Sequence, residues 1–299
     1  MKRTLGLTLL LFATLFSCMR QEKPLPAELS RAESVMWEHP DSALSILRSM
    51  PQSSLSSGKN YATWALLLAQ ARDKVYGKRL PDSLNIPSSD KLVQDAMDYF
   101  EKEGNLKRMA QTYYYKGQLL KDQKKITEAM PFFLKSKEMM TKLDEPLFTY
   151  LICQSLGNTY RYQDLYEESL VQLKDAYQYA LRSGNGERIS YALSELGRTY
   201  VHKNEMDSAL FYFGKSLDNA QRLGNIELEA MAMGELGVVY NKLSQGEKAL
   251  HYTRKELDLC LQISSLHKLP QVYYKIGSAF WSLGQLDSAK VYFQKSLET

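Results

Sequence analysis

Five glycines recur at a constant 40-residue interval through the C-terminal two-thirds of the chain. A glycine inside a helix costs about 1 kcal/mol relative to alanine, so a strict recurrence needs a common cause. The cause we favour is the close approach of a neighbouring helix at each of these positions. The spacing therefore predicts an all-α chain of stacked amphipathic helix pairs, of which residues 190–223 are the clearest example. The glycines are Gly117, Gly157, Gly197, Gly237 and Gly277.

Two further positions, which we call columns of the repeat, follow the same 40-residue spacing as the glycines. The residue 12 positions after each glycine is small, which lets two helices approach closely. The residue 16 positions after it is mostly large and apolar, which fills the neighbouring space at interior packing density. A generic helical bundle has no reason to repeat such columns at one spacing, so a repeat array is favoured over a bundle. The small residues are Ala129, Ser169, Ala209, Ala249 and Ala289, and the larger ones are Phe133, Leu173, Phe213, Thr253 and Phe293.

These columns resemble a known repeat. Leucine before the glycine, an aromatic ring three residues after it, and the small and large columns together resemble the tetratricopeptide repeat. The resemblance covers residues 105–299, with weaker traces back to Glu28, and implies a right-handed helix–turn–helix solenoid over residues 28–299. The common unit of that family has about 34 residues. The 40-residue spacing here therefore implies longer helices.

The resemblance also implies where a partner binds. In this family the first helix of each pair lines a concave groove, and the positions one and four after the glycine, and three before it, point into it. These columns imply a polar, partly aromatic and mildly basic groove that suits an extended peptide or a partner helix of some acidic character. The alternative is that they are merely solvated polar positions. Of the Lys and Asn positions that form a carboxylate clamp in chaperone-binding members, only Asn158 matches. The implied groove residues are Tyr114, Gln118, Lys121, Gln154, Asn158, Arg161, Arg198, Asn241, Tyr274 and Trp281.

The N-terminus is predicted to be a targeting segment. Lys2 and Arg3 precede 14 uncharged residues, a stretch that is short for a membrane span but suits a signal peptide. The following Leu-Phe-Ser-Cys sequence resembles the lipobox of bacterial lipoproteins, although Phe16 is bulkier than the usual residue. The resemblance implies a signal peptide over residues 1–17, lipid attachment at Cys18 and a tether over residues 18–27. It places the protein in the bacterial envelope, on the periplasmic side of the outer membrane. The alternative is an ordinary secretory signal.

No catalytic constellation emerges from the sequence. The four histidines are scattered, without the spacing of a metal site and without a paired nucleophile. Glu247 and His251 stand four residues apart, but two ligands make a poor metal site, and we interpret them as a surface pair. Cys153 and Cys260 lie in apolar stretches and are predicted to be buried free thiols. The net charge is only +4 and shows no basic stripe of the nucleic-acid-binding type. We therefore predict no enzyme activity, no cofactor, no metal and no nucleic-acid partner.

The N-terminal helices are predicted to be less regular than the array. A short helix is expected over residues 28–38, a second from Asp41, a long one over residues 60–76 and a further one over residues 90–103. A long insertion with two prolines, residues 78–89, separates the last two. Gly-Asn pairs are predicted to end helices at Gly104, Gly184 and Gly224.

Together these features favour a lipid-anchored, non-catalytic scaffold that binds a protein or peptide. Two alternatives stay open. One is the sensor portion of a membrane-linked, repeat-containing transcriptional regulator that lacks its output domain. The other is a glycan-capturing lipoprotein, with residues 78–89 as the only insertion that could hold a sugar site. No polar capping helix follows the last predicted helix, so we expect it to pack on another subunit or domain, or the chain to be a shortened form of a longer one.

Overall fold

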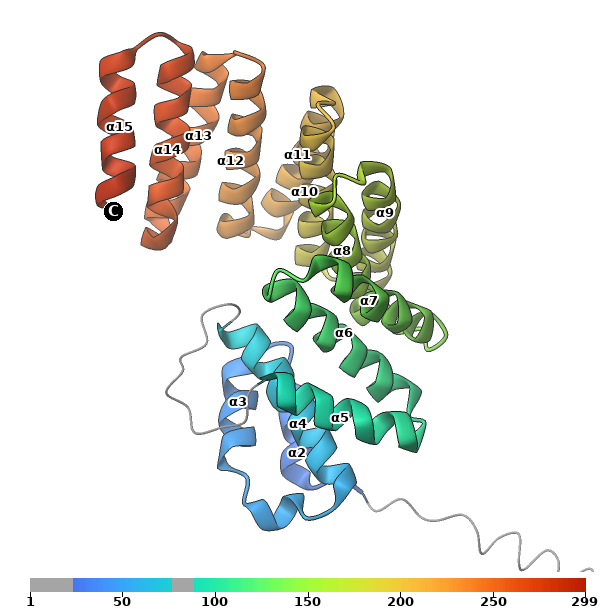
Figure 1. The fold of residues 1–299 in the computed structure, drawn as a ribbon. Helices are drawn as coiled ribbons and strands as arrows, with labels where there is room; N and C mark the ends of the chain where they lie inside the picture. Colours follow the sequence, from blue (N-terminus) through green and yellow to red (C-terminus); the bar gives the residue numbers. More distant parts are fainter. Residues whose placement is uncertain (1–23, 77–88) are drawn as a thin grey trace, which may run out of the picture. The chain divides into compact units, whose positions relative to one another are not determined.

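The computed structural model describes residues 24–76 and 89–299 (Figure 1). Every regular element in these two stretches is a helix and none is a strand, so the predicted fold class is confirmed. The chain divides into two compact units, Met1–Lys102 and Glu103–Thr299. The predicted signal peptide, Cys18, most of the tether and all of the insertion except Ser89 lie outside the described residues. Within those residues, no helix is both long and apolar enough to cross a membrane.

The described part of the N-terminal unit holds short and long helices in succession. Proline at the first turn of a helix has no N–H to leave unpaired, so the second helix begins one residue earlier than predicted, at Pro40. The Trp64 indole donates to the Leu47 carbonyl (2.9 Å), and the Tyr61 hydroxyl donates to Asp95 Oδ2 (2.9 Å). These bonds tie the long helices to each other and to the short ones. The elements are α2 (Ala27–Val35), α3 (Pro40–Ser49), the 3₁₀ turn η1 (Gln52–Leu55), α4 (Gly58–Tyr76) and α5 (Ser89–Glu103).

The C-terminal unit is a succession of helix pairs, each joined by a short turn (Figure 1). The first helix of every pair carries one glycine of the 40-residue series, as predicted. The pairs are α6 (Leu106–Asp122) with α7 (Ile126–Thr141), α8 (Pro146–Tyr162) with α9 (Tyr166–Ser183), α10 (Gly186–His202) with α11 (Met206–Leu223), α12 (Ile226–Lys242) with α13 (Gly246–Gln262), and α14 (Leu269–Ser282) with α15 (Leu286–Glu298). A 3₁₀ turn, η2 (Leu266–Lys268), precedes α14.

The helices of this unit end on residues with left-handed backbone geometry. Such a residue turns the chain out of the helix and lets the next N–H reach a carbonyl left free at the helix end. At the end of α10, for example, the Glu205 N–H donates to the Tyr200 carbonyl at 2.9 Å. The predicted ends at Gly104, Gly184 and Gly224 are confirmed, and they belong to a longer series with one such residue at every twentieth position. It consists of Gly104, Lys124, Asp144, Asp164, Gly184, Asn204, Gly224, Ser244, Ser264 and Gly284.

The glycine series packs against the column of larger residues that follows each glycine, which confirms the predicted cause of its spacing. A Cβ added at Gly197 would lie 2.6 Å from Phe213 Cε1, and one added at Gly157 would lie 2.5 Å from Leu173 Cγ. The other three glycines face Phe133, Thr253 and Phe293 at 2.6–2.7 Å in the same way. Each first helix therefore lies so close to its own second helix that a methyl group does not fit between them.

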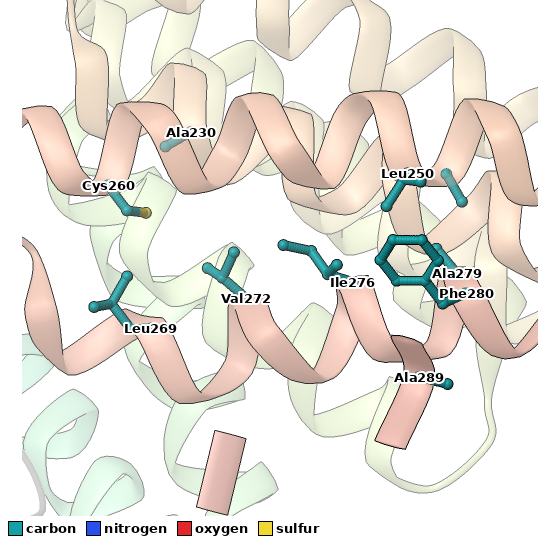
Figure 2. Packing of buried hydrophobic residues seen from close by; sticks show 10 residues of the cluster. Ala230, Leu250, Cys260, Leu269, Val272, Ile276, Ala279, Phe280 and Ala289 are labelled. Atoms are coloured by element: carbon teal, nitrogen blue, oxygen red, sulfur yellow. The ribbon is translucent and has the colours of Figure 1, made fainter. Parts of the chain in front are cut away.

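Apolar side chains fill the space from one pair to the next. Figure 2 shows this core for the last two pairs, where Val272 and Ile276 of α14 lie in one cluster with Leu250 and Cys260 of α13. Full burial of a side chain of this size stabilises a fold by about 1.5–3 kcal/mol. Cys260 and Cys153 are buried free thiols, as predicted. Burial raises the pKa of the Cys153 thiol to about 12, so it stays protonated at neutral pH.

Candidate functional site

The side chains implied to line a groove all lie on first helices, at positions three before, one after and four after each glycine. The structure adds the column two before the glycine, because its side chains bond from one pair to the next. Positions two before, one after and four after the glycine are three residues apart, so they follow one another along one helix face. We call this set the first-helix surface. Its members are Gln118 and Lys121 on α6; Ser155, Asn158 and Arg161 on α8; Glu195, Arg198 and Val201 on α10; Glu235, Val238 and Asn241 on α12; and Lys275, Ser278 and Trp281 on α14. On α6 the first of the three positions holds Tyr115, which is buried in the core.

Four charged side chains form a continuous chain of ion pairs across three first helices. Arg161 Nη2 on α8 lies 2.8 Å from Glu195 Oε2 on α10, and both side chains are only 10% exposed. Arg198 donates to Glu195 Oε1 at 2.7 Å and, through Nε, to Glu235 Oε1 on α12 at 2.7 Å. Burial disfavours the charged guanidinium of Arg198, but Glu235 and Glu195 outweigh burial and raise its pKa. The charges of the two arginines are therefore balanced locally by the two carboxylates.

This balance corrects the implied basic character of the surface. Arg161 and Arg198 lie near one another, since both pair with Glu195, and the carboxylates of Glu195 and Glu235 balance their charges. Glu195 and Glu235 were missed because the column two residues before the glycine was not among those carried over from the family. Their spacing held a usable signal, since Glu195 and Arg198 stand three apart on one helix face. At neutral pH the middle of this surface is polar rather than basic.

Three amide side chains also lie on this surface, together with aliphatic, hydroxyl, lysine and indole side chains. Gln118 Oε1 accepts from Lys121 Nζ at 2.6 Å and from Ser155 Oγ at 3.3 Å. Asn241 Oδ1 accepts from Ser282 Oγ at 2.9 Å. Asn158 differs from both, because its Oδ1 is shielded from solvent and meets no hydrogen-bond donor among the described residues. Its amide is therefore not held in one orientation through the oxygen.

Four implied groove residues lie outside the ion-pair chain and the amide contacts. Tyr114 is only 4% exposed because its ring packs on Phe133 and Phe148, 5.9 and 5.2 Å away. It belongs to the core, which corrects its assignment to the open groove. Gln154 is half-buried. The list of strongly exposed groove residues is short: Tyr274 at 60% and Trp281 at 63%.

The last pair carries an apolar hollow of about 410 Å³. Leu286 is 58% exposed and Leu297 89% exposed on this side of α15. The hollow is lined by Trp281, Leu286, Lys290, Phe293, Gln294 and Leu297. Elsewhere in the described ranges, no cluster of three or more His, Cys, Asp or Glu residues has the arrangement of a metal site.

Comparisons with known proteins agree with this architecture. Two segments, residues 110–139 and 270–299, match the tetratricopeptide repeat model, and they correspond to the first and last pairs of the array. The apo form of RapI is similar over 90% of this chain and 74% of its own, with a TM-score of 0.72 and 15% identity. A Rap protein complexed with Competence and Sporulation Factor covers 91% and 75%, with a TM-score of 0.70 and 12% identity.

A third similar structure is NprR in complex with its cognate peptide NprX. It covers 93% of this chain and 79% of its own, with a TM-score of 0.67 and 14% identity. At such identities the likeness is one of fold. No curated protein matches the sequence. The class is thus an all-α repeat protein built from helix pairs. More specifically, its first and last pairs match the tetratricopeptide repeat model, and its fold is similar to that of RapI.

Proposed function

We propose that this chain is a non-catalytic scaffold that holds an extended peptide, or an extended segment of a partner protein, along its first-helix surface. The fold supports the proposal, because a similar array in NprR is seen with its cognate peptide. The surface itself offers polar side chains from successive helices at a regular interval. An extended backbone presents N–H and C=O groups at regular intervals too, so main-chain recognition suits such an array.

The observation that carries the proposal is the unpartnered amide oxygen of Asn158. A shielded acceptor without a donor costs the free protein about 1–3 kcal/mol. The terminal torsion of an asparagine is broad and roughly two-fold, so the amide can turn its oxygen toward a ligand. No hydrogen bond to that oxygen has to break first. A peptide N–H would therefore supply a donor that the free protein lacks.

The charge balance of the surface limits the kind of partner. Arg161 and Arg198 already bind Glu195 and Glu235, so an acidic peptide would have to displace a carboxylate to reach them. Breaking a buried ion pair is costly. At neutral pH we therefore expect recognition through main-chain amides and through the exposed rings of Tyr274 and Trp281.

Selection from a displayed peptide library on the full chain tests this function. The selected peptides are then titrated by fluorescence polarisation against wild type and Asn158→Ala. Loss of one hydrogen bond worth about 0.5–1.5 kcal/mol predicts roughly two- to tenfold weaker binding. The free energy of unfolding should not fall, because the variant also loses an unsatisfied acceptor.

Gln178→Ala is the matched control, since it removes an exposed amide from α9, a second helix. It should leave the affinity unchanged. Competition between the selected peptides shows that they share one site. If such peptides bind wild type and Asn158→Ala with equal affinity, the basis of the proposal is removed.

We also propose that the scaffold is lipid-anchored in the bacterial envelope through Cys18, at the periplasmic face of the outer membrane. The lipobox-like sequence before Cys18 supports this. Metabolic labelling with a radioactive fatty acid should mark the wild-type protein and leave Cys18→Ser unlabelled and released from membranes. Labelling of both proteins, or of neither, contradicts the anchor.

A further inference from the structure

The position 19 residues after the glycine, on the second helices, holds serine in three pairs, alanine (Ala176) in the second pair and glutamate in the fourth. In the three pairs with serine, its hydroxyl donates to a carbonyl of its own first helix. Ser136 donates to Ala110 at 2.6 Å, Ser216 to Ser190 at 3.0 Å and Ser296 to Pro270 at 2.7 Å. In the fourth pair this column holds Glu256, and the corresponding carbonyl belongs to Ala230.

Glu256 is buried and reaches into the next pair. The side chain is 7% exposed, and Oε1 accepts from Lys275 Nζ of α14 at 2.7 Å. Its second oxygen, Oε2, is shielded from solvent and meets no hydrogen-bond donor among the described residues. Gly234 of α12 makes room for the pair, because a Cβ there would lie 2.4 Å from both Glu256 Oε1 and Lys275 Nζ. The ion pair thus fills the volume of a missing side chain.

The alignment of neighbouring first helices explains why the Lys275 side chain turns inward, toward α13. The residue two before the glycine bonds to the residue one after the preceding glycine at two boundaries, Ser155 with Gln118 and Glu235 with Arg198. At the next boundary that position is Val238, which offers Lys275 no acceptor. The ammonium turns to Glu256 instead, and a cation of the first-helix surface is held inward.

We propose that Lys275 is a latent anion-binding group of the first-helix surface, released when Glu256 takes up a proton. Neutral Glu256 then has an O–H donor, as serine has in three other pairs, and it can donate to the Ala230 carbonyl in the same way. The proton comes from solvent. The ammonium, without its internal carboxylate, binds a carboxylate of a bound acidic peptide. This deepens the proposed function, because it assumes a partner on the same surface.

The charges that face Glu256 determine when the proton arrives. Burial raises the pKa of this carboxyl, Lys275 of α14 lowers it, and Glu235 of α12 adds a smaller rise. Lys268 of η2 also lowers it, but this lysine is itself paired with Glu227 at 2.6 Å. The net direction is upward, and Cys260 is the further titratable group on the same helix that senses Glu256. Glu256 therefore takes up its proton at a higher pH than an ordinary glutamate does.

A fluorescein-labelled hexaglutamate peptide is the probe. Its binding to the full chain is measured by fluorescence polarisation at about pH 7.5 and about pH 5.5, where the peptide stays largely ionised. Wild type should bind roughly two- to fivefold more tightly at the lower pH, the range of one partly exposed ion pair. Glu256→Ser and Glu256→Gln should bind at the higher pH as wild type does at the lower, with the pH dependence reduced to the background level.

Lys275→Met is the control for other titrating groups, since it removes the latent cation and retains those groups. It should bind weakly at both pH values. Two Glu256 variants are used so that one poorly folded protein does not decide the result. A wild-type affinity that ignores pH, equal binding by wild type and both Glu256 variants at the higher pH, or no binding by any protein overturns the proposal. Failure here with the Asn158 result intact counts against Lys275 alone, because hexaglutamate needs no selected peptide.

Discussion

Replacing Gly197 by alanine sets two effects of opposite sign against each other. In a helix interior, alanine is favoured over glycine by about 1 kcal/mol. A Cβ at this position, however, would lie 2.6 Å from Phe213 Cε1 and 2.8 Å from Cδ1. Carbon atoms prefer to be about 3.5–4.0 Å apart. Moving the buried ring to relieve this overlap should cost about 1–3 kcal/mol, as overpacked cores do.

Gly214 supplies the matched control. It lies within α11, and a Cβ there would meet nothing within 4 Å. Gly214→Ala should therefore show the helix-propensity gain alone, a stabilisation of about 1 kcal/mol. The difference between the two variants cancels propensity and isolates the overlap. We expect Gly197→Ala to be less stable than Gly214→Ala by about 1–3 kcal/mol.

Urea unfolding followed by circular dichroism measures both variants, with midpoints compared at equal slope. A double-mutant cycle sharpens the test, since Phe213→Ala removes the ring that the new methyl group meets. In that background, Gly197→Ala should stabilise by about 1 kcal/mol, as Gly214→Ala does in the wild type. Equal midpoints for Gly197→Ala and Gly214→Ala would show that the glycine spacing has some cause other than helix contact.

Three other results are expected. Lys124 follows the end of α6 with a φ of 63°, and this left-handed geometry costs a non-glycine residue about 1–2 kcal/mol. Lys124→Gly should therefore raise the urea midpoint, and a lower midpoint contradicts the left-handed geometry of this turn. The raised pKa of Glu256 makes the folded state bind its proton more tightly than the unfolded chain, so the stability it contributes is present at low pH and lost as pH rises through the folded pKa. Wild type should therefore gain stability relative to Glu256→Gln as pH falls toward the ordinary value of 4.5, and parallel curves would exclude this. Leu297 is 89% exposed on α15, and this face is expected to mediate self-association. Sedimentation velocity should show that wild type associates as its concentration rises and that Leu297→Glu remains a monomer. A wild type that is monomeric at all concentrations contradicts self-association through this face.

The architecture was predictable because it repeats. One glycine in each repeat, with its small and large companion columns, is a pattern that only paired helices explain, and Gly197 with Phe213 realises it directly. The turns were only partly predictable. The left-handed residue is a glycine at Gly184 and Gly224, which made these helix ends predictable. Lys124 and Asp144 adopt the same geometry without a glycine.

The functional surface was harder to predict, because its chemistry depends on contacts between helices. The sequence assigned Arg161 and Arg198 to the correct helices but could not show that both pair with Glu195. Tyr114 stands at a repeat position that lines the groove in the family, but it is buried in the core because its ring packs on Phe148 of the next pair. Glu256 could be recognised as unusual only after the structure showed that the serines at the equivalent position donate to carbonyls of their first helices.

Hydrogen–deuterium exchange of the full chain, with and without a selected peptide, tests the binding surface most directly. The peptide should slow exchange in α8, α10 and α12, which carry Asn158 and the ion-pair chain, and in α14, which carries the exposed rings of Tyr274 and Trp281. Exchange in α9 and α11 should stay unchanged. Protection confined to the second helices, or to the N-terminal unit, would contradict the proposed binding surface.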